Sequence, residues 1–280
     1  MNSHPLREIT EDEIETFWRD GVVFLPGLFD PDWIERMSGG FETAIQDLGP
    51  LGRNYNPEGE PGAFYMDLGV WKRNPVFEAF ATSSPAPAVA ARLMGAEKVH
   101  VYDDQLFVKE PGTNYPTPFH QDWTYFHFDG WQICGIWFTV DPVGPDDGAL
   151  GYVRGSHRWD KAFQPIPIGG ARSNDLYSAK PAGSEDVLDK LPDIEANPDD
   201  YDLVFFDYKP GDCSVHHIRT IHGSKGNASK TTRRRAVTVR YCGDDATYLA
   251  RPYAPEQGHG AYLKDGDPIG GPDYPLVWPR

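Results

Sequence analysis

Apolar residues in the first third of the chain recur mainly at helical spacing. Residues 10–13 read Thr-Glu-Asp-Glu, a capping-box sequence that predicts the start of a helix. Gly21 ends that helix, and residues 22–25 are predicted to form a short buried strand. Asp30 and Pro31 suit the cap and first turn of a second helix that runs toward Leu48. A third helical stretch is predicted over about residues 75–93.

From residue 97 onward the pattern changes to short apolar or alternating runs. Proline and glycine separate these runs, as they do between the strands of a sheet. The strand-like runs cover residues 98–108, 133–140, 203–206, 213–217 and 236–242. Helices followed by many short strands predict a mainly β, α+β protein in which a sandwich or barrel has helices packed on one side.

We expect one domain over residues 1–280. Its N-terminal part, residues 1–95, is predicted to be mostly helical, and residues 96–243 to form the β-rich core. Residues 160–200 are long and polar and are interpreted as a lid-like insertion. Residues 244–280 are rich in proline, glycine and aromatic residues, which suggests an ordered tail over the core.

Composition narrows the class of partner. The formal net charge is −16, so the chain should repel nucleic acid and anionic membranes, and a small-molecule substrate is expected. No run of eighteen apolar residues predicts a membrane span, and the first residues lack the apolar segment of a secretory signal. Three scattered cysteines, Cys134, Cys213 and Cys242, favour a reducing, cytoplasmic location.

The first candidate for chemistry is the triplet His120-Gln121-Asp122. Side chains alternate along an extended segment, so His120 and Asp122 project from the same face. One imidazole and one carboxylate can bind a metal together, and a third ligand would complete a facial triad with open positions. An exposed loop or a simple hydrogen-bonded pair also explains the triplet.

The candidate third ligand is His222, which lies just before a glycine turn. His216 and His217 are rivals, and any of the three also suits a buried core position. About a dozen residues later Arg233, Arg234 and Arg235 stand together in a strongly acidic protein. They are explained either by a solvated hairpin edge or by one guanidinium that points inward to bind a dicarboxylate.

These segments and their order resemble the phytanoyl-CoA dioxygenase family of iron(II)/2-oxoglutarate oxygenases over nearly the whole chain. The resemblance rests on residues 20–30 (DGVVFLPGLFD), 108–112 (VKEPG), 120–122 (HQD), 147–150 (DGAL), 155–157 (GSH) and 222–224 (HGS), with Asn227 and a later arginine. It implies a double-stranded β-helix, also called a jelly roll or cupin-like fold, with N-terminal helices packed on one sheet.

The resemblance also implies roles for individual residues. His120, Asp122 and His222 are the expected Fe2+ ligands. Arg234 is the expected partner of the distal carboxylate of 2-oxoglutarate, with Arg233 and Arg235 as alternatives. Further cosubstrate-pocket residues by the same resemblance are Lys109, Gln105, Trp137 and Ser224, for which ordinary strand packing is the competing explanation.

The implied reaction uses O2 and 2-oxoglutarate to hydroxylate an unactivated C–H bond, with release of succinate and CO2. Asp122 favours hydroxylation, since related halogenases lack this carboxylate. Desaturation, ring formation, a non-catalytic jelly-roll binding module and a zinc hydrolase are the alternatives. Residues that flank the motifs and line the substrate pocket or the core are Tyr65, Asp67, Trp123 and Tyr125, together with Trp71, Phe126 and His127. The acidic charge speaks against a CoA thioester as substrate.

Overall fold

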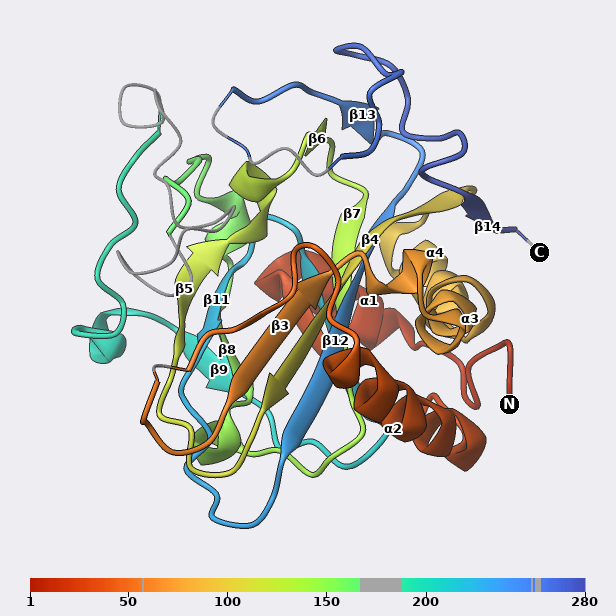
Figure 1. The fold of residues 1–280 in the computed structure, drawn as a ribbon. Coiled ribbons are helices and arrows are strands. Elements are labelled where there is room, and N and C mark those ends of the chain that lie inside the picture. The colour runs from red at the N-terminus through yellow and green to blue at the C-terminus, as the bar shows by residue number, and fades with distance from the viewer. Residues whose placement is uncertain (57, 167–187, 253, 255–257, 280) are drawn as a thin grey trace.

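Helices come first in this chain, and strands dominate the rest (Figure 1). The computed structural model describes residues 1–56, 58–166, 188–252, 254 and 258–279. Its α-helices are α1 (Glu11–Asp20), α2 (Pro31–Gln46), α3 (Pro75–Ser83) and α4 (Ala86–Met94). Short 3-10 helices are η1 (Val70–Lys72), η2 (Asp122–Tyr125), η3 (Pro145–Asp147), η4 (Ser156–Arg158) and η6 (Pro198–Asp200).

The caps predicted for the first two helices are present. The Thr10 hydroxyl accepts from the backbone N–H of Glu13, and the Glu13 carboxylate accepts from that of Thr10. Gly21 ends α1 in the left-handed conformation, with φ 77°. The third predicted helix is instead two helices. Ser84 is extended because the following residue is Pro85, and proline disfavours a helical conformation in the residue before it.

The larger of two main sheets has the order β1-β10-β7-β12-β4-β3-β2, and β14 also pairs with β4. Its strands are β1 (Val22–Leu25), β10 (Cys213–His217), β7 (Ile133–Thr139), β12 (Arg234–Cys242), β4 (Val99–Lys109), β3 (Phe64–Leu68), β2 (Arg53–Asn54) and β14 (Leu276–Trp278). The second sheet, β5-β11-β8-β9, contains β5 (Thr117–Gln121), β11 (Ile221–Ser224), β8 (Leu150–Val153) and β9 (Leu203–Phe205). β13 (Thr247–Tyr248) pairs with β6 (Phe128–Asp129).

The helices cover the outer face of the large sheet (Figure 1). Alternate residues of its strands, such as Val237, Val239 and Tyr241, join the main apolar cluster with helical residues such as Phe17 and Phe41. The intervening side chains of β12 face the second sheet, so the large sheet has an apolar outer face and a more polar inner one. This arrangement is the predicted jelly roll with helices packed on one sheet.

The mostly helical N-terminal part contributes the predicted strand β1 to the large sheet, and also β2 and β3, which were not predicted. Residues 167–187, the middle of the predicted lid-like insertion, lie outside the described residues. The flanks of the insertion place Phe163 and Ile194 in an apolar cluster with Phe119 of the second sheet. The C-terminal segment supplies β13 and β14, which pair with other parts of the core.

Candidate metal centre and cosubstrate pocket

The three predicted metal ligands meet on the second sheet. His120 on β5 and His222 on β11 are direct partners in the antiparallel ladder, and their ring centroids are 4.4 Å apart. Asp122 begins η2 immediately after β5. One potential ligand atom from each residue lies within 4.8 Å of the other two. Strand pairing therefore joins residues that are remote along the chain.

Backbone contacts fix the orientation of both imidazoles. His120 Nδ1 lies 2.8 Å from the Pro118 carbonyl oxygen, and His222 Nδ1 lies 3.0 Å from that of Thr220. A carbonyl oxygen only accepts, so each Nδ1 carries the proton and each Nε2 keeps a lone pair for a metal. Burial, together with the neighbouring His120, holds the pKa of His222 well below its usual range, so this imidazole is neutral.

The two oxygens of Asp122 have different neighbours. Oδ1 lies 3.4 Å from His120 Nε2, whereas Oδ2 accepts a hydrogen bond from Arg240 Nε at 2.9 Å. Arg240 also donates to Gln105 Oε1 at 2.9 Å and lies over the Phe126 ring. Burial opposes ionisation of Asp122, but Arg240 and the neighbouring histidines together outweigh it and hold the pKa of this carboxyl well below its usual range. One carboxylate oxygen thus remains directed toward the histidines.

His216 forms a wall beside the triad. Its ring centroid is 4.5 Å from that of His222, and its Nε2 lies 3.9 Å from Asp122 Oδ2. Neither ring nitrogen has a hydrogen-bond partner among the described residues, and burial lowers the pKa of His216. A Cβ at Gly135 would lie 2.7 Å from His216 Nε2, so glycine makes room for this ring. The other rival, His217, faces the opposite side of β10, against α1.

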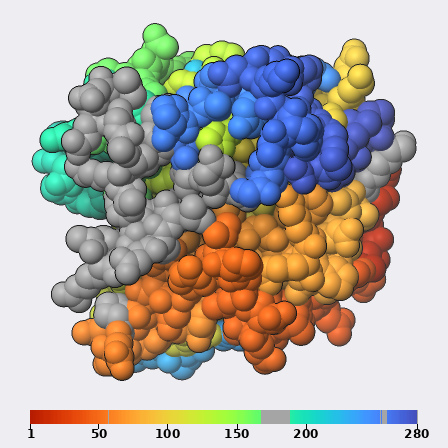
Figure 2. Space-filling view, turned by 45° about the horizontal axis from the view of Figure 1, so that its top comes forward, coloured from red at the N-terminus to blue at the C-terminus, as the bar shows by residue number. Residues whose placement is uncertain are grey.

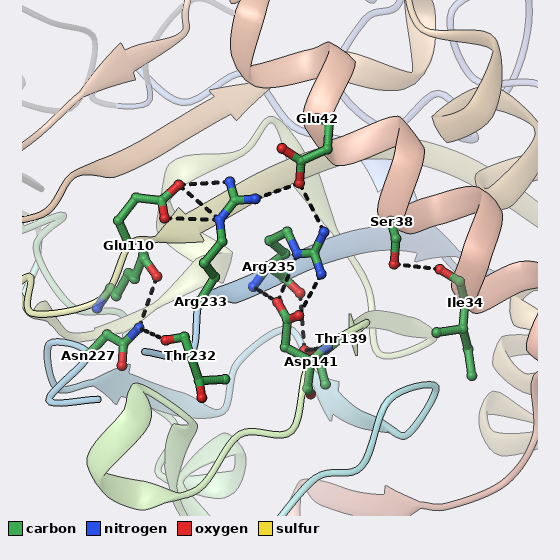
Figure 3. A network of polar contacts seen from close by, with 11 residues as sticks. Ile34, Ser38, Glu42, Glu110, Thr139, Asp141, Asn227, Thr232, Arg233 and Arg235 are labelled. Carbon is green, nitrogen blue, oxygen red and sulfur yellow. Dashed lines mark hydrogen bonds and ion pairs between the residues drawn. The ribbon is translucent and has the colours of Figure 1, made fainter. Parts of the chain in front are cut away.

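The arginine cluster divides between the two faces of β12. Arg233 pairs with Glu110 and Glu42, and Arg235 pairs with Asp141 and Glu42. Figure 3 shows both guanidinium groups in this network beneath α2, which carries Glu42. Because side chains alternate along a strand, the residue between them points to the inner face.

That residue, Arg234, is buried with Lys109, its partner on β4. Lys109 Nζ donates to Ser224 Oγ at 2.9 Å and to the Lys225 carbonyl oxygen at 2.6 Å. Arg234 lies over the Trp137 ring, 6.0 Å from its centroid. Within the described part of the chain neither cation forms an ion pair with a carboxylate. Two buried cations side by side favour an anionic ligand, since a buried charge without a partner is costly.

Their pKa values reflect this environment. Burial lowers the pKa of Arg234 to about 9, with Asp141 opposing the shift. Burial and the nearby Arg234 hold the pKa of Lys109 well below its usual range. The distal carboxylate of 2-oxoglutarate would supply the negative charge that this pair of side chains lacks, so the pocket fits 2-oxoglutarate.

The structure does not bring every candidate substrate residue to the centre. Tyr65 pairs with Val108 and packs against the outer, helix-covered cluster. Asp67 faces the same way, where it accepts from the Gly49 N–H at 2.9 Å and pairs with Arg73. Odd-numbered residues of β3 point outward, so Tyr65 packs under the helices and Asp67 holds the loop before β2 and the residue after η1, away from the triad.

Residues just after Asp122 lie closer. The Tyr125 ring packs edge-on against His120 at 5.6 Å, and its hydroxyl donates to the Ile166 carbonyl oxygen at 2.8 Å. Trp123 lies under the guanidinium of Arg219, 3.9 Å from the ring centroid. Of the other flanking aromatics, Trp71 belongs to the outer cluster, Phe126 packs beneath Arg240, and His127 stacks on Tyr248.

Sequence reasoning did not single out Arg240, the partner of Asp122. The signal was available: residues 234, 236, 238 and 240 share one face of a strand, so the assignment of Arg234 to the inner face also places Arg240 there. It also missed the buried hydroxyl chain in which Tyr208 donates to Ser214, which lies 2.8 Å from the Tyr152 hydroxyl.

Comparison with known proteins completes this description. A sequence model of the phytanoyl-CoA dioxygenase family (PhyH) matches residues 17–236. The chain belongs to the phytanoyl-CoA dioxygenase family. Among curated relatives, the ectoine dioxygenase of Stutzerimonas stutzeri (strain A1501) is 23% identical over 287 residues, covering 92% of this chain and 84% of the relative.

Solved structures share the fold of this family member. The non-heme alpha ketoglutarate dependent carbocyclase SnoK from nogalamycin biosynthesis superposes with a TM-score of 0.74 at 23% identity, covering 99% of this chain and all of SnoK. The epimerase SnoN, in a complex with Fe3+, alpha ketoglutarate and nogalamycin RO, gives 0.70 at 20% identity, covering 95% and 98%. The predicted jelly roll is confirmed.

Family membership confirms that the chain is a 2-oxoglutarate-dependent non-haem iron dioxygenase, with Fe2+, 2-oxoglutarate and O2 as the predicted cofactors. The donor set of two neutral imidazoles and one carboxylate fits that metal. In the described part of the chain, no helix has the length and apolar character needed to cross a membrane.

Proposed function

We propose that this dioxygenase binds Fe2+ through His120, Asp122 and His222, and hydroxylates a small-molecule metabolite. Arg234 would bind the distal carboxylate of 2-oxoglutarate, and Lys109, its partner on β4, lies in the same pocket. The observation that supports this most directly is a pair of buried basic side chains, Arg234 and Lys109, that have no carboxylate partner among the described residues. Lys109 donates to Ser224, which lies two residues after the candidate ligand His222 on β11. A metal-binding site alone would have no use for those cations.

Each side chain has a defined task in this proposal. The Nε2 lone pairs of His120 and His222 are held toward the metal by the hydrogen bonds of their Nδ1 atoms. Arg240 occupies Asp122 Oδ2, so Oδ1 is the ligand atom. When bound, iron and 2-oxoglutarate supply the oxidising chemistry for an unactivated C–H bond, with succinate and CO2 as coproducts.

Arg234 and Lys109 also determine which cosubstrates the pocket can bind. Arg234 forms no ion pair among the described residues, so its planar guanidinium is available to bind a carboxylate through two hydrogen bonds. Lys109 is already tied to Ser224, and its remaining N–H can reach the same ligand. The pocket therefore favours a cosubstrate with a distal carboxylate and rejects analogues that lack this group.

The carboxylate of Asp122 supports hydroxylation. It occupies a ligand position that a halide would need, and Arg240 fixes its orientation. The relatives named above include a carbocyclase and an epimerase, so desaturation or ring formation remains the alternative within the same site. Mass spectrometry of the product separates them, because hydroxylation adds one oxygen atom whereas desaturation removes two hydrogen atoms.

The ligand assignment is tested with His120→Ala and Asp122→Ala. Each should abolish succinate formation and weaken anaerobic Fe2+ binding, measured by titration calorimetry. Asp129→Asn is the matched control, since this carboxylate pairs with Arg219 and is not among the three ligands. Full turnover or unchanged Fe2+ affinity in a ligand variant would remove that residue from the metal site. A small-molecule substrate and a cytoplasmic location are part of the same proposal.

A further inference from the structure

The hydrogen-bonding groups of His216, a buried histidine beside the candidate metal ligands, are not used by any contact in the described structure. The side chain is 0% exposed, and neither ring nitrogen has a hydrogen-bond partner among the described residues. An imidazole carries one N–H when it is neutral and two when it is protonated, so at least one donor is unsatisfied in either form. A buried donor without an acceptor is costly, and an acceptor on a bound ligand would remove this cost.

The His216 ring faces the candidate metal ligands. Its centroid is 4.5 Å from that of His222, and its Nε2 lies 3.9 Å from Asp122 Oδ2, beyond hydrogen-bond distance. That carboxylate oxygen already accepts from Arg240. Because His216 is fully buried, a ligand does not reach it from the outer surface, where Figure 2 shows the blue C-terminal segment meeting the orange part of the chain. An acceptor for this N–H must come from the space between the two sheets.

A glycine on the neighbouring strand determines where the ring lies. Gly135 on β7 is the ladder partner of both His216 and Arg240. A Cβ at Gly135 would lie 2.7 Å from His216 Nε2 and 2.8 Å from Cε1. The φ angle of Gly135 is not in the left-handed region, so this position needs glycine for space and not for backbone conformation. The Nε2 edge of the ring therefore lies over β7, toward the strand that carries Arg240.

The inner face of β10 connects His216 with the cosubstrate pocket. Ser214, two residues before His216, is the ladder partner of Trp137, and Arg234 lies over the Trp137 ring. Across the sandwich, the Tyr152 hydroxyl lies 2.8 Å from Ser214 Oγ, and the Tyr152 ring centroid is 5.5 Å from that of His216. This wall runs from the guanidinium to the metal ligands. A cosubstrate held by Arg234 at one end would therefore present its other end to His216.

We propose that His216 donates a hydrogen bond to the carboxylate of 2-oxoglutarate at the end opposite Arg234. This inference rests on the proposed function, in which Arg234 binds the distal carboxylate. A carboxylate accepts from the N–H that faces it, whereas a group that only donates would leave the imidazole donor unsatisfied. His216 would then help the pocket distinguish a keto acid from the corresponding methyl ketone.

The test measures binding by titration calorimetry to Fe2+-loaded protein without oxygen. The probes are 2-oxoglutarate and 4-oxopentanoate, which keeps the distal carboxylate and the ketone but has a methyl group in place of the other carboxylate. His216→Phe should weaken 2-oxoglutarate binding about tenfold and leave 4-oxopentanoate binding within about twofold, because only 2-oxoglutarate loses a charge-assisted hydrogen bond. His216→Gln, which keeps an N–H donor, should bind 2-oxoglutarate within about threefold of the wild type.

The matched control is His100→Phe. It removes an imidazole whose Nδ1 lies 2.9 Å from the Tyr274 carbonyl oxygen, beside the C-terminal segment, and it should bind both probes as the wild type does. Circular dichroism establishes that each variant is folded. If His216→Phe does not fold, His216→Leu takes its place, with the same expected loss for 2-oxoglutarate and the same indifference to 4-oxopentanoate.

Equal affinity for 2-oxoglutarate in His216→Phe and the wild type would overturn the proposal and leave a water molecule as the partner of the imidazole. Equal weakening of both probes would also overturn it, since the loss would then come from packing or from the ketone. If Arg234→Met loses 2-oxoglutarate binding and His216→Phe keeps it, the proposed function stands and only the role of His216 is wrong. A wild type that does not bind 2-oxoglutarate would overturn both.

Discussion

Replacing Arg234 by methionine should stabilise the metal-free enzyme and abolish its response to 2-oxoglutarate. Arg234 is 2% exposed and lies beside a second buried cation, Lys109, on the neighbouring strand. Burial lowers the pKa of Arg234 to about 9, a drop from the ordinary arginine value that corresponds to about 5 kcal/mol against the charged form. The guanidinium nevertheless stays charged near neutral pH, so the folded protein without ligand carries most of this cost.

Water in the pocket of the metal-free protein reduces this cost, so we expect Arg234→Met to raise the free energy of unfolding of the metal-free protein by about 2 kcal/mol. The sign of its pH dependence follows from the lowered pKa. Below about pH 8 the guanidinium is charged in both the folded and the unfolded chain, so the gain is constant there. As the pH rises through about 9 the folded wild type can lose the proton, and the gain shrinks.

Two measurements test this reasoning. Urea unfolding of metal-free protein gives the stability difference, and thermal unfolding with Fe2+ and 2-oxoglutarate in the absence of oxygen gives the ligand response. The wild type should gain about 2.7 kcal/mol at a 2-oxoglutarate concentration of 100 times Kd, and Arg234→Met should gain none. The control is Arg233→Gln, whose guanidinium pairs with Glu110 and Glu42 outside the pocket, and which should respond like the wild type.

A metal-free Arg234→Met protein that is less stable than the wild type by more than about 1 kcal/mol would refute the claim that this buried cation lacks a partner. If Arg233→Gln loses the 2-oxoglutarate response and Arg234→Met keeps it, then Arg233, and not Arg234, is the arginine that binds 2-oxoglutarate.

Two further changes probe the surroundings of the triad. Arg240→Gln should weaken Co2+ binding about tenfold and alter the visible absorption spectrum of the bound Co2+, because Asp122 Oδ2 loses the partner that orients the carboxylate. Arg235→Gln is the control and should change neither the affinity nor the spectrum. An unaltered spectrum in Arg240→Gln would count against a role of Arg240 in orienting Asp122. Gly135→Ala should lower the free energy of unfolding, measured in urea, by about 1–3 kcal/mol, because the added Cβ would lie 2.7 Å from His216 Nε2. A decrease of less than about 0.5 kcal/mol would show that the His216 ring moves freely.

Local patterns in the sequence predicted much of the fold. The capping box at Thr10 and the Asp30–Pro31 pair act on neighbouring backbone groups, so a short stretch of sequence determines where α1 and α2 begin. The long apolar strands β4, β7 and β12 were predicted for the same reason. The short strands β5, β8 and β11, which carry or flank His120 and His222, have no such pattern, because they are stabilised by pairing across the sheet.

The site divides in the same way. The sequence determined the chemical groups, which are two histidines and an aspartate of metal-binding type and an arginine cluster, and the family resemblance implied that Arg234 is the member that binds the cosubstrate. The tertiary structure alone decided that Arg240 holds Asp122 and that Tyr65 and Asp67 face the helices. These outcomes depend on ladder register and on contacts between segments remote along the chain, and a shift of one residue in register moves a side chain to the other face of the sheet.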